Sequence, residues 1–460
     1  MRKKVLSTIL CLTTGLSVLV GCGSTSAETT ENPTNETTSE AVAQENKTEA
    51  SSDAQAGNTE EEVTITYWGW DVSNFAQPLM DKYHELHPNV TFEPTAVEWG
   101  DMIPKTQQAL ASGSELPTII PMDLGLLGVW KNMDIFEDLT QYGLDVSKYN
   151  PALMASTTDD NGKVFGLHEA VNPAAIAYKR DLAEKYLGTS DPDEIQAMLQ
   201  SYDDYIKVGT KIKEASGGKA FMFHSGQAIA EWFYFASTTP NAVDGNINAT
   251  AKYTEIMDLL TSFRDAGIVD TYQNGTPEGN ATYADDSHIF YPCPDWAVSY
   301  YIQANDPDGA ARGNWGLIMA PQGYQHGGAA MGITSASSDA QKKAAYDFIT
   351  WAISSEEGAT IMRDTAGYIT HDSTINTGDF AKRSDEAVFG GEDISTLFYK
   401  TIAGRIEIAT PSAYDGNITD VRNDIAQQVM NDSSMDTATA VQAAIDELST
   451  LITDTNVTIK

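Results

Sequence analysis

Tryptophan and aspartate residues recur after three segments near the start of the folded part of the chain. They are Trp68, Trp70 and Asp71 at the end of the first segment, Trp99 after the second, and Asp123 after the third. An aromatic ring can cover the apolar face of a small molecule or hold a cation, and a carboxylate accepts hydrogen bonds from hydroxyl or ammonium groups. These residue types therefore indicate noncovalent binding of a small ligand.

The elements that must position these side chains are predicted as alternating strands and helices. Val63–Trp70, Val90–Val97 and Leu116–Pro121 have the alternating or continuously apolar composition of strands. Asn74–His87 and Met102–Ser112 have apolar residues at helical spacing. This order predicts βαβ units with a mainly parallel sheet, and ligands collect at the carboxyl ends of such strands. We therefore expect the five side chains to converge on one edge.

Other tryptophans have a packing interpretation beside the functional one. Trp130 and Trp351 fall inside predicted helices, and we assign both to packing. Trp315 begins a predicted strand and is compatible with either role. Ala230–Ala236 is aromatic at helical spacing, a pattern that is typical of a core helix. Cys293 is the only cysteine of the body and is expected to be a small buried hydrophobe.

The N-terminus predicts export. Arg2, Lys3 and Lys4 precede an apolar run that is short for a membrane span. Leu19–Cys22 resembles the lipobox of bacterial lipoproteins, which implies a signal peptide at residues 1–21 and a lipid chain such as palmitate on Cys22. The alternative is an ordinary signal peptide. Residues 22–62 have the polar, acidic composition of a disordered linker, which would tether the body to the outer face of the cytoplasmic membrane.

Composition and missing motifs exclude several classes of function. The formal charge of −37 makes nucleic acid and anionic lipid surfaces poor partners. The sequence has no phosphate-binding glycine loop, no HExxH or CxxC metal motif and no GxSxG nucleophile motif. Its seven histidines are scattered, so no metal site and no cofactor are expected. Asp191–Glu194 could attract a cation, but a helix capped by Asp191 explains the same residues.

The order of the motifs resembles the family 1 extracellular solute-binding proteins of ABC importers, which include maltodextrin-binding proteins. The segments that carry the resemblance are Val63–Trp70, Ala111–Pro117, Asn132–Thr140, Gly162–Leu167, Tyr178–Asp181, Asp295–Tyr300, Ala320–Gly323, Gly328–Ile333, Ala344–Gly358 and Asp436–Leu448. It covers nearly the whole body.

The resemblance implies an α/β fold of two lobes, each a mainly parallel sheet flanked by helices, with hinge strands between them and a ligand cleft. We place the first lobe at 63–168 and 286–334 and the second lobe at 169–285 and 335–460. The chain is expected to cross between the lobes near Leu167–Glu169 and again before Cys293.

The resemblance also supplies candidate binding residues. Trp296 matches a tryptophan that stacks on sugar, and Trp232 or Tyr234 falls near a second aromatic position. Asp123 lies in a loop that often contacts ligand, and Tyr414 lies near a third aromatic position. With Glu169 at the expected crossing, the full set of predicted ligand-binding residues is Trp68, Trp70, Asp71, Trp99, Asp123, Glu169, Trp232, Tyr234, Trp296 and Tyr414. The sequence departs from maltodextrin-binding protein at Trp68–Asp71, which leaves the identity of the sugar open.

We therefore expect a monomeric, lipid-anchored receptor that captures a neutral sugar or oligosaccharide and delivers it to the permease subunits of an ABC importer. One alternative is a receptor for a polyamine or an amino acid, because aromatic boxes also hold cations. Another is a secreted glycoside hydrolase, which needs two carboxylates at a defined separation. The candidate carboxylates are Glu98, Asp123, Glu169 and Asp295.

Overall fold

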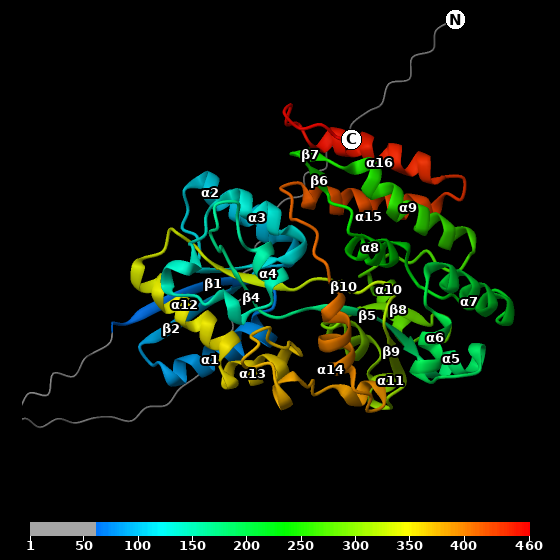
Figure 1. The fold of residues 1–460 in the computed structure, drawn as a ribbon, viewed down its shortest axis with the longest axis horizontal. Coiled ribbons are helices and arrows are strands. Elements are labelled where there is room, and N and C mark those ends of the chain that lie inside the picture. The colour runs from blue at the N-terminus through cyan, green and yellow to red at the C-terminus, as the bar shows by residue number, and fades with distance from the viewer. Residues whose placement is uncertain (1–60) are drawn as a thin grey trace, which may run out of the picture. The chain divides into compact units, whose positions relative to one another are not determined.

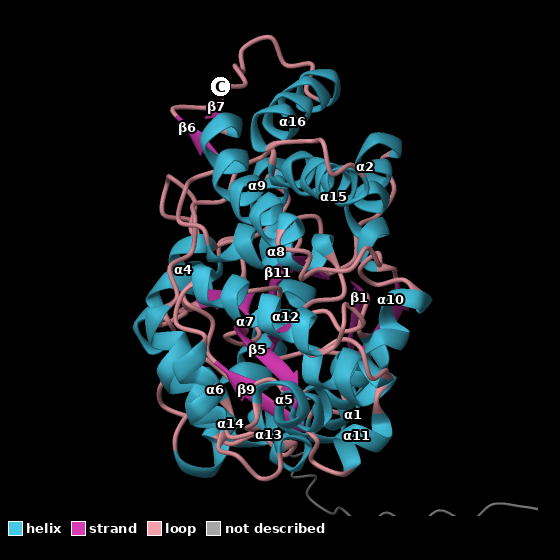
Figure 2. Cartoon of the chain, turned by 90° about the vertical axis from the view of Figure 1, so that its right-hand side faces the viewer, coloured by secondary structure: helices cyan, strands magenta, loops and turns pink. Residues whose placement is uncertain are grey.

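The computed structural model describes residues 61–460 of the 460-residue chain. The predicted signal peptide, nearly all of the predicted linker and Cys22 lie outside the described residues. The described part folds into two lobes of helices around strands, which Figure 1 shows side by side. Figure 2 shows the strands in the interior with helices outside them. In the following, the lobe built on strand β1 is called the first lobe and the lobe built on strand β5 the second lobe.

The first lobe contains a five-stranded sheet in the order β2-β1-β3-β11-β4. Its strands are β1 (Val63–Gly69), β2 (Val90–Ala96), β3 (Ile119–Asp123), β4 (Leu167–His168) and β11 (Ala329–Ile333). Its helices are α1 (Gln77–Leu86), α2 (Met102–Ser112), α3 (Leu127–Met133), α4 (Pro151–Ser156), α12 (Asp339–Ser354) and α13 (Glu356–Ala366). β1 pairs in parallel with β2 and β3, as the alternation of strands and helices predicts, whereas β11 runs antiparallel to its neighbours.

The second lobe contains the sheet β10-β5-β8, and β9 also pairs with β5. Its strands are β5 (Pro173–Lys179), β8 (Phe290–Pro294), β9 (Trp315–Ile318) and β10 (Tyr324–Gln325), with a hairpin of β6 (Ala242–Val243) and β7 (Asn246–Ile247). Its helices are α5 (Arg180–Leu187), α6 (Pro192–Met198), α7 (Tyr202–Ala215), α8 (Gly226–Ala236), α9 (Ala249–Asp265), α10 (Pro277–Ala281), α11 (Pro307–Ala311), α14 (Ile394–Thr396), α15 (Asp415–Asn431) and α16 (Thr437–Leu451). All seven residues of β5 are buried, because strands and helices enclose it on every side.

The second sheet corrects one part of the predicted fold. A mainly parallel sheet was expected in each lobe, but β5 runs antiparallel to β8, β9 and β10. The alternation of strands and helices is regular only in the first part of the chain. Farther along, the direction of a strand depends on where the chain re-enters the sheet, which hydrophobic periodicity does not encode.

The lobe boundaries also differ from those predicted. β8 and β9, expected in the first lobe, pair with β5 in the second. Helices α12 and α13, expected in the second lobe, contribute Phe348, Ile353 and Met362 to the core that contains Ile65. Sequence order alone could not show this, because the strands that lie beside β5 come from distant parts of the chain.

Within residues 61–460 the chain crosses between the two lobes at three places. The first crossing is 169–172, between β4 and β5, as predicted. The second is 326–328, between β10 and β11, and replaces the crossing predicted before Cys293. The third follows α13 and leads to Val388 and Phe389, which join the core around β5 and β8. Gly327 and Gly328 have positive φ angles of 73° and 89°, which favour glycine, and a Cβ on Gly328 would lie 2.1 Å from Asn172 Oδ1.

Several smaller sequence predictions agree with the structure. Trp130 is fully buried and Trp351 is half-buried against the core that contains Ile65, whereas Trp315, for which the sequence left both roles open, is fully buried. Cys293 is buried and unpaired with another cysteine. Asp191 caps α6 by accepting hydrogen bonds from the backbone of Asp193 and Glu194.

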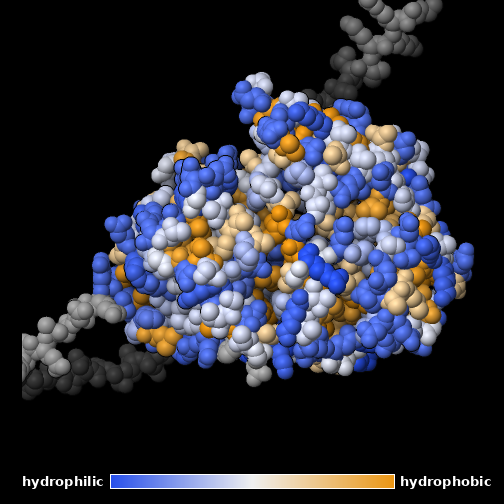
Figure 3. Space-filling model, viewed as in Figure 1, coloured by the Kyte–Doolittle hydropathy of each residue, from blue (hydrophilic) through white to orange (hydrophobic). Residues whose placement is uncertain are grey.

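No helix among the described residues is long and apolar enough to cross a membrane. The face in Figure 3 is mainly hydrophilic, with apolar residues in small groups.

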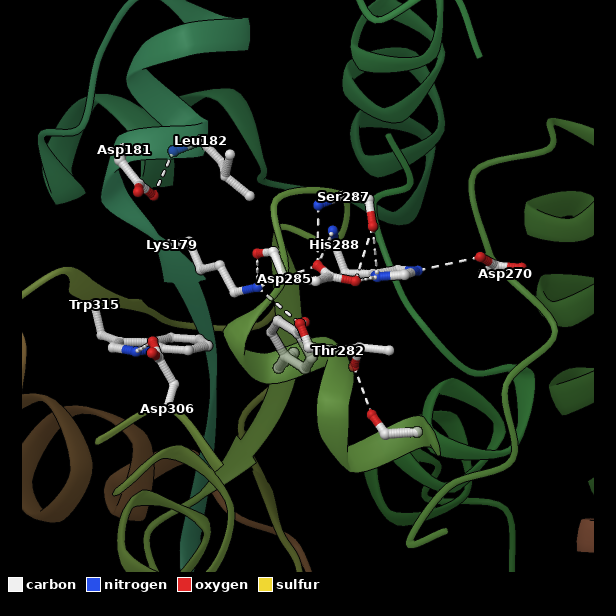
Figure 4. Close-up of polar contacts among 12 residues, drawn as sticks. Lys179, Asp181, Leu182, Asp270, Thr282, Asp285, Ser287, His288, Asp306 and Trp315 are labelled. Atoms are coloured by element: carbon white, nitrogen blue, oxygen red, sulfur yellow. Dashed lines mark hydrogen bonds and ion pairs between the residues drawn. The ribbon is translucent and has the colours of Figure 1, made fainter. Parts of the chain in front are cut away.

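A buried polar network attaches β5 to the loop before β8, as Figure 4 shows. The Lys179 ammonium donates hydrogen bonds to the carbonyl oxygens of Thr282 and Asp285, at 2.8 and 2.6 Å. The His288 ring lies between two carboxylates, with Nδ1 2.7 Å from Asp285 Oδ2 and Nε2 3.2 Å from Asp270 Oδ2. Burial opposes the charge on His288, but hydrogen bonds to both carboxylates outweigh it and raise its pKa.

We expect the His288→Gln substitution to destabilise the protein more at about pH 6 than at about pH 9. Because the pKa of His288 is raised on folding, its charged form stabilises the fold below the unfolded pKa of about 6.5. That contribution is lost as pH rises through the folded pKa. Urea unfolding of both proteins at the two pH values measures the effect. An equal deficit at both values would contradict a role for the charge on His288.

Candidate functional site

A cavity of about 450 Å³ lies between the two lobes. The first lobe lines it with Tyr67, Trp70, Asp71, Phe75, Trp99, Pro121, Asp123, Gly125, Leu126, Ala329 and Tyr368. The second lobe lines it with Glu231, Phe235, Trp296, Tyr300, Tyr301 and Thr419. Glu169, His326, Gly327 and Gly328 line it from the first two crossings. The residues after β1, β3, β4 and β8 thus meet at one place, as expected for strand ends that face a cleft.

Aromatic rings from both lobes face this cavity. Trp296 follows β8, and its Nε1 donates a hydrogen bond of 2.8 Å to the carbonyl oxygen of His326. Tyr300 and Tyr301 pack on the same indole, with ring centroids 6.4 and 5.6 Å away. On the other side Trp99 is 46 % exposed, so its ring is free to contact a ligand. Flat apolar surfaces are therefore available on both sides of the cavity.

Two of the cavity carboxylates have favourable polar partners, but burial outweighs the partners at Asp123 and the partners outweigh burial at Glu231. Asp123 is the last residue of β3 and accepts a hydrogen bond of 2.8 Å from the Gly125 amide, but burial raises its pKa to about 6. Glu231 lies 3.5 Å from His326 Nε2 and 3.3 Å from Arg422 Nη2. Burial opposes the charge on Glu231, yet these two partners outweigh it and lower its pKa to about 2.

Asp71 and Glu169 line the same cavity. The hydroxyl of Tyr300 donates a hydrogen bond to Asp71, which links the two lobes. Glu169 is 5 % exposed, and its carboxylate has no hydrogen-bond or ion-pair partner among residues 61–460. Burial, followed by the charges of Asp71 and Asp123, raises the pKa of Glu169 well above its usual value.

The lobes touch each other beside the cavity. Gly128 of α3 lies against the backbone of Ser412, and a Cβ placed on Gly128 would be 2.1 Å from the Ser412 carbonyl oxygen. Gly416 of α15 also faces α3, but a Cβ placed there would be 3.7 Å from Leu126 and 3.9 Å from Val129, which is ordinary contact. The absence of a side chain at Gly128 thus allows α3 to approach the backbone at Ser412, and the lobes are in contact here.

Six of the predicted site residues line the cavity, and four do not. Those that line it are Trp70, Asp71, Trp99, Asp123, Glu169 and Trp296. Trp68 instead packs on the buried cluster that contains Ile120 and Trp130, with the Lys105 ammonium 4.6 Å from its ring. Tyr414, at the start of α15, packs on the buried cluster that contains Tyr253 and Ile418.

The remaining two predictions fail because of the orientation of α8. Trp232 is fully buried among Tyr202, Tyr205 and Phe223. Tyr234 is buried too, and its hydroxyl accepts a hydrogen bond from Asn241. The residues of α8 that reach the cavity are Glu231 and Phe235, four positions apart and therefore on one helix face. The sequence contains this four-residue spacing. Choosing residues of α8 only because they are aromatic selected Trp232 and Tyr234, which lie on helix faces that point into the core.

The structure also bears on the catalytic alternative. Of the four candidate carboxylates, only Asp123 and Glu169 line the cavity. Glu98 is exposed on the surface. Asp295 is buried and accepts hydrogen bonds from Asn172 and Tyr399, so it stabilises the first crossing. Among the described residues, no group of three His, Cys, Asp or Glu side chains could hold a metal ion.

Two α/β lobes joined by three crossings, with a cavity between them in the part that the structure describes, define the fold of the periplasmic binding proteins. The chain belongs to the bacterial extracellular solute-binding protein family, whose model matches residues 78–387. Membership of this extracellular family implies that the protein is exported.

Solved structures with this fold include several receptors. A crystal structure of an extracellular solute-binding protein of family 1 is 18 % identical, with a TM-score of 0.73 over 84 % of this chain and 100 % of that chain. The galacto-N-biose/lacto-N-biose I-binding protein of Bifidobacterium longum is 18 % identical, with a TM-score of 0.70 over 88 % and 100 %. A binding protein of B. animalis subsp. lactis in complex with β-1,6-galactobiose is 20 % identical, with a TM-score of 0.65 over 84 % and 98 %. At these identities the likeness shows the fold.

Proposed function

We propose that this protein is the receptor of an ABC importer and binds a carbohydrate between its lobes. The observation that carries the proposal is the cavity lined by tryptophan from both lobes, with Trp70 and Trp99 on one side and Trp296 on the other. A sugar ring has faces of C–H bonds that aromatic planes cover and a rim of hydroxyls that carboxylates hydrogen-bond. Two of the structures above were solved with a bound sugar, lacto-N-biose in one and β-1,6-galactobiose in the other. These ligands support the same ligand class here.

Capture proceeds by closure of the lobes in this proposal. A sugar binds the open form on one lobe, and closure brings the other lobe's aromatic rings over it. The closed form is then recognised by the permease subunits. The protein acts as a monomer and needs no cofactor.

Calorimetry with a panel of mono- and oligosaccharides tests this function. We expect at least one carbohydrate to bind, to raise the melting temperature and to be recovered intact by chromatography. Cleavage of the sugar would instead favour the hydrolase, with Asp123 and Glu169 as the carboxylates to test. Binding of polyamines or amino acids without any carbohydrate would favour the other type of receptor.

We further propose that acylation of Cys22 anchors the protein to the outer face of the membrane. The apolar run that stops at Cys22 and the polar segment that follows support this proposal. We expect Cys22→Ser to move the protein from the membrane fraction to the medium, because the thiol that carries the lipid is gone. Immunoblotting of both fractions measures the shift, with Cys293→Ser as the matched control. Unchanged membrane retention of the Cys22 variant would contradict the anchor.

A further inference from the structure

Two of the carboxyl groups that line the cavity, those of Asp71 and Glu169, have no positively charged partner among the described residues. Among the cavity carboxylates of the described chain, Glu231 is paired with His326 and Arg422. Glu169 has no such partner, although about nineteen twentieths of its surface is buried. The charged groups that act on it are Asp71 and Asp123, and both are acidic. An unpaired carboxylate in a buried position is costly, so a partner supplied from outside would be strongly favoured.

The aromatic rings around Glu169 also fit a positively charged partner. Tyr67, Phe75 and Tyr368 line the cavity on the first lobe, and the Phe75 and Tyr368 rings are 5.5 Å apart. Tyr300 reaches across from the second lobe to Asp71. The titratable groups that face Glu169 are thus Tyr67, Tyr300 and Tyr368 together with the two aspartates. Aromatic faces attract cations through their quadrupole, and this attraction is stronger where water is excluded.

We propose that Glu169 and Asp71 receive a protonated amine of the ligand, so that the captured carbohydrate is an amino sugar with a free ammonium group. The inference rests on the proposed function and replaces the neutral sugar expected from the sequence with a cationic one. An ammonium group carries three N–H donors, which can satisfy two carboxylates at once. A hydroxyl supplies one donor and no charge, and an N-acetyl group supplies one N–H and also no charge.

Three disaccharides with the same β-1,4 linkage test the inference, since they differ only in the substituent at carbon 2. They are the glucosamine dimer, its N,N′-diacetyl form and cellobiose. Glucosamine and galactosamine beside glucose and galactose provide matched monosaccharides. At about pH 6.5, calorimetry should give at least tenfold tighter binding for an amine-bearing member than for its neutral counterparts.

The variant Glu169→Gln keeps the size of the side chain and removes its charge. It should weaken binding of the amine at least tenfold and reduce the preference over the neutral counterpart to less than threefold. Glu98→Gln, an exposed residue next to Trp99, is the matched control and should leave the preference unchanged. A thermal melt of each variant shows that the fold is retained.

Proton release provides a second measurement. Because burial and the neighbouring aspartates raise the pKa of Glu169, an approaching ammonium should displace a proton from it. Titration in two buffers of different ionisation enthalpy should detect this release in the wild type and not in Glu169→Gln.

The outcomes separate the inference from the proposed function. If a neutral or acetylated sugar binds as tightly as its amine, or if Glu169→Gln leaves the preference intact, the amine subsite is wrong and the carbohydrate receptor stands. If no carbohydrate from a broad glycan panel binds, the proposed function itself is wrong and the amino-sugar inference with it.

Discussion

Replacing Trp296 by alanine should weaken carbohydrate binding roughly 30-fold or more, which corresponds to the loss of at least about 2 kcal/mol that central aromatic contacts contribute. Trp296 lies just after β8, lines the cavity and packs with Tyr300 and Tyr301. Its removal therefore takes away one apolar plane and loosens two others. Calorimetry with any carbohydrate that binds the wild type measures the loss.

Two variants help to interpret this result. Trp296→Phe keeps a smaller aromatic plane and removes the hydrogen bond to His326, so it should retain more affinity than the alanine variant. Trp351→Ala removes a half-buried tryptophan of α12 that packs on Tyr83, outside the cavity, and should lower the melting temperature without changing affinity. Unchanged affinity in Trp296→Ala would show that the aromatic platform is not used.

Gly128→Ala should weaken ligand binding by about 5- to 150-fold without destabilising the protein. The new Cβ would lie 2.1 Å from the carbonyl oxygen of Ser412. The lobes could therefore reach the contact seen here only by distorting, which disfavours the closed form. Overpacking of this kind costs roughly 1–3 kcal/mol. Alanine is also the better helix former by about 1 kcal/mol, which favours α3 itself. Affinity and stability should therefore change in opposite directions.

Small-angle scattering can follow the closure directly. The wild type should become more compact when ligand is added, and Gly128→Ala should respond only at higher ligand concentration. Gly404→Ala is the matched control, since a Cβ on Gly404 meets no atom within 4 Å and its φ angle is not in the left-handed region. An affinity equal to that of the wild type in Gly128→Ala would mean that the ligand-bound form does not bring α3 against Ser412.

The part of the fold that is encoded locally was predictable from sequence. Met102–Ser112 is a helix with the predicted bounds, because its apolar spacing and the terminal Gly113 define it. β1 and β2 also begin at the predicted residues. The partners of β5 were not predictable, since β8, β9 and β10 reach it from more than a hundred residues away and nothing in their composition gives their direction.

The same distinction applies to the site. Trp70 and Asp71 follow β1 and Asp123 ends β3, so their position at the cleft follows from the topology of the first sheet. Phe235 and Glu231 depend on the rotation of α8 about its axis, which only its packing fixes. The second crossing at Gly327–Gly328 has a visible glycine pair, but the sequence alone did not show which strands it joins.

The first two crossings of the described chain are themselves part of the cavity wall, through Glu169 and through His326–Gly328. The backbone segments that must rotate when the lobes separate are therefore the segments that a bound molecule would touch. Ligand binding and lobe movement then depend on the same backbone segments. Substitutions at these positions should alter how long the bound molecule resides as well as how tightly it is held, and release to the next component of an importer would be timed by the segments that join the lobes.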